Sequence, residues 1–144
     1  MFLGIGIQNG AVFQRNAGNV SEHPLSGTAR FSGDLLLTAR SGSRIIAGFD
    51  NKIIGNCSNG KLSGVITGLP TGGPYTLEFS IAGTRERLVI SNIAVGDLWL
   101  LAGQSNMAGY AFMPSKSETS DMVHAFYMDN TWGTAKTPDR KSVV

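Results

Sequence analysis

V-G-D-L-W-L-L-A-G-Q-S-N-M-A-G, residues 95–109, is the stretch from which the fold of this chain can be argued. Its apolar run at residues 98–102 predicts a buried strand, which ends abruptly at Gly103. A strand that ends at glycine and delivers a serine to the rim of a sheet is a common way to present a nucleophile. The stretch therefore predicts a buried strand that presents a reactive serine at the edge of a sheet.

Ser105 is the candidate nucleophile of this segment. Gly103 removes a Cβ that would crowd a sharp turn, and the Ser105 N–H is a candidate oxyanion donor. Gln104 and Asn106 either shape the turn or contact substrate, and the sequence leaves both roles open. The block differs from the G-x-S-x-G elbow, because Met107 stands two residues after the serine.

The same block carries a family resemblance. V-G-D-L-W-L-L-A-G-Q-S-N-M resembles the first block of the sialate O-acetylesterase-like carbohydrate esterases, in the SGNH hydrolase superfamily. Further matches are G-A-V-F-Q-R at residues 10–15, G-G-P-Y-T-L at 72–77 and V-H-A-F-Y-M-D-N-T-W-G-T-A at 123–135. In that family the serine of G-Q-S-N-M is the catalytic nucleophile, which corresponds to Ser105.

The resemblance implies a serine esterase that removes O-acetyl groups from sugars such as sialic acid, without a cofactor. The family takes its base and acid from an Asp-x-x-His block near the end of a longer domain. Asp121-Met122-Val123-His124 spells this pattern only 19 positions after Ser105, and we treat it as a chance match. We therefore expect the chain to be the N-terminal part of a longer enzyme and inactive by itself.

Residues 1–94 carry the signals of short strands joined by tight turns. Turn sequences such as Asn59-Gly60 and Pro70–Pro74 separate them, and Tyr75–Ile81 alternates apolar and polar residues. The predicted strands are Leu3–Ile7, Ala11–Gln14, Thr28–Phe31, Leu35–Ala39, Arg44–Phe49, Leu62–Thr67, Tyr75–Ile81 and Arg85–Ile90. Regular short strands without a helical period favour a β-sandwich.

The predicted fold class is a β-sandwich module, jelly-roll or immunoglobulin-like, followed by the truncated start of an SGNH-type α/β hydrolase domain. The module spans residues 1–94 and the incomplete catalytic domain spans 95–138, with residues 122–128 as its second strand and 129–131 as a turn. Residues 139–144 depart from the family pattern and match a peptide encoded by sequencing-adapter DNA. We expect them to be a non-native tail.

Composition excludes several classes of protein. A hydrophobic fraction of 42% in 144 residues predicts a folded protein with a sizeable core. A net charge of +2 without a basic stripe gives no support for nucleic-acid binding, and no apolar run is long enough for a membrane span. Cys57 is the single cysteine, so no intrachain disulfide can form.

The sequence leaves the compartment, the oligomeric state and the particular sugar open. Relatives in the family are often exported or lysosomal. The apolar start at Met1–Ile7 lacks a basic leader and a cleavage site, and it predicts a strand rather than a signal peptide.

The two histidines and one cysteine do not form a metal-ligand cluster, so no metal site is predicted. We expect His23 to be a solvated loop residue and His124 to lie half-buried or outward on a strand. Asp97 lies about 25 Å from Ser105 along an extended strand, too far for a triad acid. Arg15, at a strand end, is expected to pair with a carbonyl or a carboxylate.

A second functional class remains open, namely a non-catalytic carbohydrate-binding or adhesion β-sandwich. Aromatic side chains exposed on one face would favour it. The sequence places its main aromatic residues in the core instead: Phe13, Phe31, Phe49, Tyr75 and Phe79.

Overall fold

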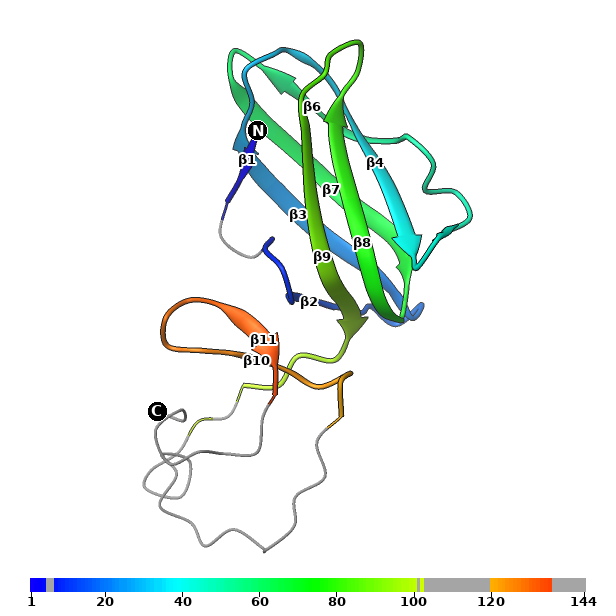
Figure 1. The fold of residues 1–144 in the computed structure, drawn as a ribbon, viewed down its shortest axis with the longest axis vertical. Coiled ribbons are helices and arrows are strands. Elements are labelled where there is room, and N and C mark those ends of the chain that lie inside the picture. Colours follow the sequence, from blue (N-terminus) through cyan, green and yellow to red (C-terminus); the bar gives the residue numbers. More distant parts are fainter. Residues whose placement is uncertain (5–6, 101, 103–119, 136–144) are drawn as a thin grey trace, which may run out of the picture.

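The computed structural model describes residues 1–4, 7–100, 102 and 120–135 (Figure 1). Every regular element in these residues is a β-strand. The strands are β1 (Phe2–Leu3), β2 (Val12–Gln14), β3 (Val20–Thr28), β4 (Gly33–Ser41), β5 (Arg44–Ile45), β6 (Lys52–Ser58), β7 (Lys61–Pro70), β8 (Gly72–Ile81), β9 (Arg87–Gly96), β10 (His124–Phe126) and β11 (Trp132–Thr134).

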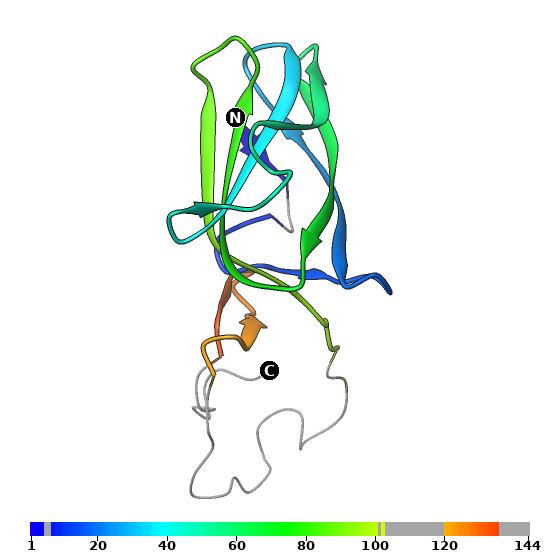
Figure 2. The ribbon, with the colours of Figure 1, turned by 90° about the vertical axis from the view of Figure 1, so that its right-hand side faces the viewer.

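The first nine strands form one sheet, in the order β1-β3-β7-β6-β4-β8-β9-β2, with β5 paired to β4. Only β2 and β9 pair in parallel. The sheet curls so that its two ends face each other (Figures 1 and 2), and a bridge between Arg15 and Ser21 links β2 to β3. The predicted sandwich of two sheets is therefore wrong, because the strands pair continuously around the core.

Register shifts help the sheet to curl. The β4–β6 ladder shifts between Leu35 and Leu36, and the β3–β7 ladder shifts between Val20 and Glu22. Such bulges bend a strand and increase its twist. At the β6–β7 crossing a side chain would not fit, since a Cβ on Gly64 would lie 2.6 Å from the Ile54 carbonyl oxygen.

The inward-facing side chains of the curled sheet make a single core. On β8 the alternation predicted from sequence is confirmed, with Tyr75, Leu77, Phe79 and Ile81 all buried. The Asn59-Gly60 turn is confirmed as well. Both residues have positive φ, 52° and 77°, as a two-residue hairpin turn of type I′ requires.

Three strand predictions failed for physical reasons. The strand predicted at Arg44–Phe49 ends at Ile45, because a turn follows in which Gly48 has a φ of 77°. The strand predicted at residues 28–31 lies instead at Val20–Thr28. Along the outer side of this strand β1 pairs with Gly27 and Thr28, so Pro24 lies where no described strand needs the N–H that proline lacks. Strand β6 was not predicted because Gly55 interrupts its apolar pattern. That glycine is required, since a Cβ there would overlap the Ser63 carbonyl oxygen of β7.

The predicted start of an α/β hydrolase domain is also wrong for the described residues, which contain strands and no helix after β9. Strands β10 and β11 pair antiparallel across the short turn 127–131. The sheet of an α/β hydrolase domain has parallel neighbouring strands, which need a crossover of a dozen or more residues, usually a helix. The turn at residues 127–131 is too short for such a crossover. The predicted turn at residues 129–131 is confirmed, and Asn130 has a φ of 62° there.

The β10–β11 hairpin docks against the N-terminal part of the chain (Figure 1). Gln8 donates a hydrogen bond of 2.9 Å from Nε2 to the Asn130 carbonyl oxygen. Trp132 is half-buried and packs against the core, and a Cβ on Gly10 would lie 3.1 Å from the Trp132 carbonyl oxygen. The hairpin is therefore held near β2 and the end of β9.

Candidate functional site

The four predicted site residues lie outside the described residues: Gly103, Gln104, Ser105 and Asn106. The structure describes the chain before and after these residues in the sequence. The chain approaches it through the end of β9 and residues 97–100, and residues 120–135 follow it.

The segment that leads toward Ser105 does not form the predicted buried strand. Leu98, Trp99 and Leu100 are 46%, 84% and 92% exposed. Strand β9 ends at Gly96, and no described strand pairs with residues 97–100. An apolar run becomes buried only where other elements cover it, and no described element covers this one.

Asp97 forms an ion pair with Arg15 through two hydrogen bonds. The Arg15 Nε lies 2.9 Å from Oδ1, and Nη2 lies 3.0 Å from Oδ2. These hydrogen bonds lower the pKa of the Asp97 carboxyl and raise the pKa of the Arg15 guanidinium. The expectation that Arg15 pairs with a carbonyl or carboxylate is confirmed, and the Asp97 carboxylate is already paired.

His124 lies half-buried at the start of β10, as expected. Its Nδ1 is 2.6 Å from the Gly10 carbonyl oxygen, and its Nε2 is 3.2 Å from the Asp121 carbonyl oxygen. A neutral imidazole has one N–H, so one ring nitrogen can donate to a carbonyl oxygen, while the other also faces a carbonyl oxygen, which has no proton for a base to remove. This arrangement makes His124 a tether between the hairpin and the sheet.

His23 is not a solvated loop residue, contrary to the prediction. It lies on β3, and its ring stacks on the buried Phe13 with the ring centres 4.1 Å apart. Burial disfavours the charged imidazolium and lowers the pKa of His23. The sequence contains two histidines, and both have structural contacts in this arrangement.

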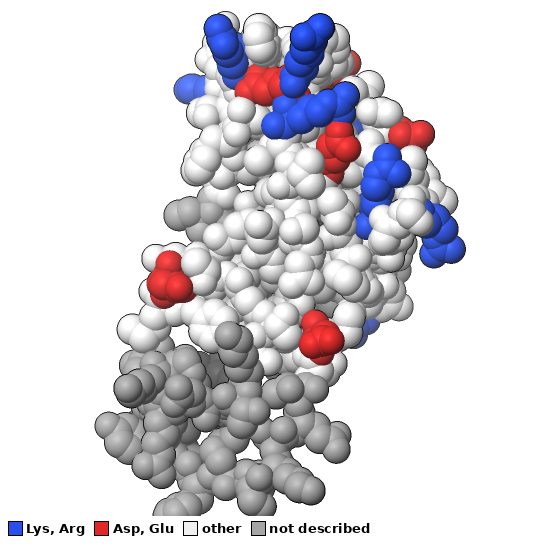
Figure 3. Space-filling view, in the orientation of Figure 1, with Lys and Arg blue, Asp and Glu red and all other residues white. Residues whose placement is uncertain are grey.

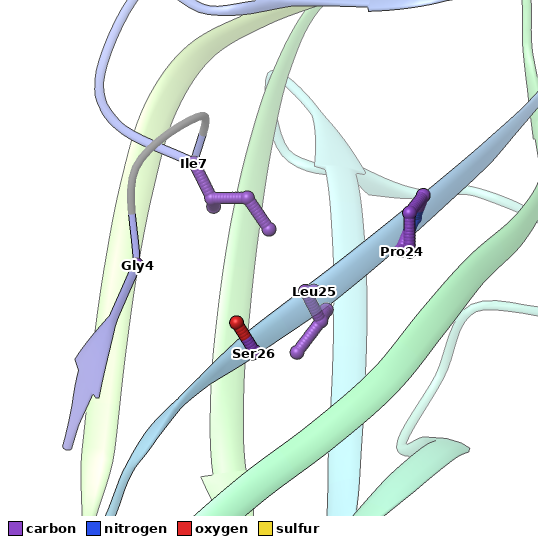
Figure 4. Close-up of a pocket in the computed structure, with 5 residues that line it drawn as sticks. All are labelled: Gly4, Ile7, Pro24, Leu25 and Ser26. Carbon is purple, nitrogen blue, oxygen red and sulfur yellow. The ribbon is translucent and has the colours of Figure 1, made fainter.

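Two of the hollows on the described surface lie along the curled sheet. One, of 240 Å³, lies between the N-terminal segment and β3, and Ser26 supplies its only side-chain hydroxyl (Figure 4). The other, of 610 Å³, lies at the loops after β3 and β8 and is lined by Arg30, Phe31, Gly83, Thr84, Arg85 and Glu86.

Glu86 in the wider hollow holds the loop after β3. Its carboxylate accepts hydrogen bonds from the backbone N–H groups of Arg30 and Phe31, at 3.0–3.2 Å, and pairs with the Met1 ammonium at 2.5 Å. The hydrogen bond from that ammonium lowers the pKa of Glu86 most, and the two backbone N–H groups add to the effect.

On the face shown in Figure 3, most Lys, Arg, Asp and Glu side chains lie over the part of the curled sheet away from the hairpin. Within the described ranges, no three His, Cys, Asp or Glu side chains lie close enough together to hold a metal ion. The same part of the chain contains no helix of the length and hydropathy needed to cross a membrane.

Residues 95–143 match the carbohydrate esterase family of sialic acid-specific acetylesterases. The match covers about a third of the chain and includes the whole G-Q-S-N-M block. It supports the family expected from that block and an enzyme of the esterase kind. It also extends into the predicted non-native tail, residues 139–144, which lies outside the described residues. No curated protein matches the chain.

Sequence reasoning missed the contacts of Gln14, the last residue of β2. The Gln14 Oε1 accepts a hydrogen bond of 2.8 Å from the Leu98 N–H, just beyond the last residue of β9. The signal was present in the quoted motif G-A-V-F-Q-R, where a polar residue ends the strand and another follows it. The parallel pairing of β2 with β9, which brings those residues to Asp97, cannot be inferred from strand periodicity.

Proposed function

We propose that this protein is a carbohydrate O-acetylesterase of the SGNH superfamily and that Ser105 is its nucleophile. The observation that carries the proposal is the esterase family match over residues 95–143, which contains the G-Q-S-N-M block. The substrate would be an O-acetylated sugar such as sialic acid, and the reaction needs no cofactor.

In the proposed reaction, the Ser105 Oγ attacks the carbonyl carbon of the acetyl ester while a base removes its proton. The resulting oxyanion accepts hydrogen bonds, for which the Ser105 N–H is a candidate donor. The C–O bond to the sugar then breaks, the sugar oxygen takes a proton, and an acetyl-enzyme remains. Water attacks the acetyl-enzyme and releases acetate and the free serine.

Neither histidine of the sequence suits the base in this reaction. His23 stacks on Phe13, and both ring nitrogens of His124 face carbonyl oxygens. We therefore propose that an Asp-x-x-His block outside these 144 residues supplies the base and its orienting carboxylate, as the family resemblance implies. Gly103 would allow a sharp turn before the serine, and Gln104 and Asn106 would support the turn or contact substrate.

The test is release of acetate from an O-acetylated sialic acid by the full-length gene product. We expect Ser105→Ala to lower kcat by at least about 1,000-fold, because removal of a serine nucleophile leaves only residual catalysis. Ser26→Ala, an exposed serine on β3, is the matched control and should keep full activity. Equal turnover by the Ser105→Ala variant would reject the nucleophile assignment.

One observation favours the second functional class, carbohydrate binding without catalysis. Four of the five aromatic residues predicted in the core are buried, but Phe31 is 45% exposed at the 610 Å³ hollow. The Arg30 guanidinium lies 5.6 Å from the centre of its ring. An aromatic face beside arginines suits a sugar that carries a carboxylate.

Binding can be separated from catalysis by titrating the chain with an oligosaccharide that carries a terminal sialic acid. If the hollow binds sugar, Phe31→Ala should weaken binding at least about tenfold, while Ser105→Ala should leave it unchanged. Binding that survives the Phe31→Ala change, or no binding to the unaltered chain, would reject this second function.

A further inference from the structure

The chain leaves the curled sheet through a network of side chains that have no part in the core. Gln14, Arg15 and Asp97, which we call the exit clamp, form its centre. Gln14 pairs with Gly96 at the last position of the parallel β2–β9 ladder, and the Arg15 N–H donates to the Gly96 carbonyl oxygen at 2.8 Å. The network begins where this backbone pairing stops.

Beyond that point, side chains replace the backbone as partners. The Leu98 N–H donates to the Gln14 Oε1 at 2.8 Å, and Arg15 holds both oxygens of the Asp97 carboxylate. The Gln14 Nε2 donates to the Arg15 carbonyl oxygen at 2.9 Å, so the amide orientation is fixed. The direction of residues 97–98 is therefore set by contacts from β2, although these residues belong to no strand.

The clamp is also anchored to the rest of the sheet. The Arg15 Nη1 donates to the Asn19 side-chain oxygen in the loop before β3. The Asn19 carbonyl oxygen in turn accepts a hydrogen bond of 2.9 Å from the Thr71 N–H, between β7 and β8. Contacts from β2, the end of β9, the loop before β3 and the β7–β8 turn thus meet where the chain departs, and a bidentate arginine–carboxylate pair gives that point a fixed geometry.

We propose that Gln14 and Arg15 are positioning residues, which hold Asp97 and Leu98 so that the chain runs from the sheet toward Ser105 in one direction. Ser105 follows Asp97 by eight residues. A nucleophile must be held close to its productive position, and a small misplacement from a distant change can lower the rate about 100-fold. This inference rests on the proposed function of Ser105.

A double-mutant cycle on the full-length gene product tests the clamp. Arg15→Ala and Asp97→Ala should each lower kcat for acetate release about tenfold with KM unchanged. The double variant should fall no further, because the two residues act as one unit. Arg87→Ala removes the ion pair with Glu78 and is the matched control, which should keep the kcat of the unaltered enzyme.

A merely structural ion pair would behave differently. With such an ion pair, kcat would stay within twofold of the unaltered enzyme in both single variants, or the two losses of kcat would multiply in the double variant. Either result overturns the proposal. A charge-conserving Arg15→Lys variant adds a second readout. Lysine cannot reproduce the two parallel hydrogen bonds, so its kcat should fall as in Arg15→Ala.

Amide hydrogen exchange of Leu98 tests the clamp without any turnover. In Gln14→Ala and Arg15→Ala the Leu98 amide should exchange at least about tenfold faster than in the unaltered chain, while core amides of β8 keep their rates. If Ser105→Ala retains full turnover, the proposed function fails and this measurement alone decides the clamp. An unchanged Leu98 exchange rate would then reject it.

Discussion

Ser21 is a polar residue with no exposed surface, and its hydroxyl stabilises the bulge at the start of β3. Its Oγ donates to the Ile66 carbonyl oxygen at 3.1 Å and accepts from the Leu69 N–H at 3.2 Å. The side chain therefore replaces backbone partners that the register shift removes. The sequence offers no sign of this role, since Ser21 lies in a polar run beside Glu22.

Ser21→Ala should lower the free energy of unfolding by about 1–3 kcal/mol, because the change leaves a buried N–H and a buried carbonyl without this partner. Chemical denaturation of the 144-residue chain measures the loss. Ser26→Ala, on an exposed face of the same strand, should change stability by less than about 0.5 kcal/mol. Equal stability of the two variants would contradict the role given to Ser21.

His23 should make stability depend on pH. Burial holds its pKa below the ordinary value of 6.5, so the unfolded chain takes up a proton at a higher pH than the folded chain. The contribution of His23 is complete above pH 6.5 and is lost as the pH falls from 6.5 through its folded pKa. The carboxyl groups with lowered pKa values affect the free energy of unfolding at more acidic pH, around and below about 4.5. They are Glu86, Asp97 and Asp129.

Between about pH 5 and pH 7.5, the free energy of unfolding should therefore rise with pH. The reason is that unfolding takes up as much as one proton at His23 in this range. His23→Gln should remove this part of the slope, measured by denaturation at several pH values. An identical slope in both proteins would show that the folded and unfolded states protonate His23 alike.

At the scale of elements, the sequence predicts a strand well where apolar and polar residues alternate along it. It predicts a strand poorly where contacts with neighbouring strands determine which residues fit. Strand β8 was found because Tyr75–Ile81 alternates, and the β6–β7 turn because Asn59-Gly60 requires positive φ. Strand β6 was missed because the close approach of β7 demands Gly55. The run at Leu98–Leu100 was expected to be buried, but burial depends on covering elements that lie elsewhere in the chain.

The two tryptophans distinguish the docked hairpin from the exposed segment. Trp132 packs on the core, whereas Trp99 is 84% exposed. Trp132→Ala should lower the free energy of unfolding by roughly 1–2 kcal/mol, the scale of burying part of a large apolar side chain. Trp99→Ala should leave it within about 0.5 kcal/mol. A comparable loss in both variants would contradict the docking of the hairpin.

At the scale of the whole molecule, the described part of the chain is one curled sheet with a small hairpin docked beside the end of β9. The core and the candidate nucleophile could be proposed from the sequence, because alternation and the G-Q-S-N-M block are local patterns. The pairing of Arg15 with Asp97, 82 positions apart, could not, since it depends on β2 lying parallel to β9. Strand pairing of this kind cannot be predicted from any single segment of the sequence.

Covalent labelling can show whether Ser105 is a reactive nucleophile. The full-length gene product would be treated with a fluorophosphonate, which forms a stable adduct with activated serines, and the modified residue located by mass spectrometry. We expect a single adduct on Ser105, formed in parallel with the loss of acetate release. An adduct on another serine, or loss of activity with Ser105 unmodified, would contradict it.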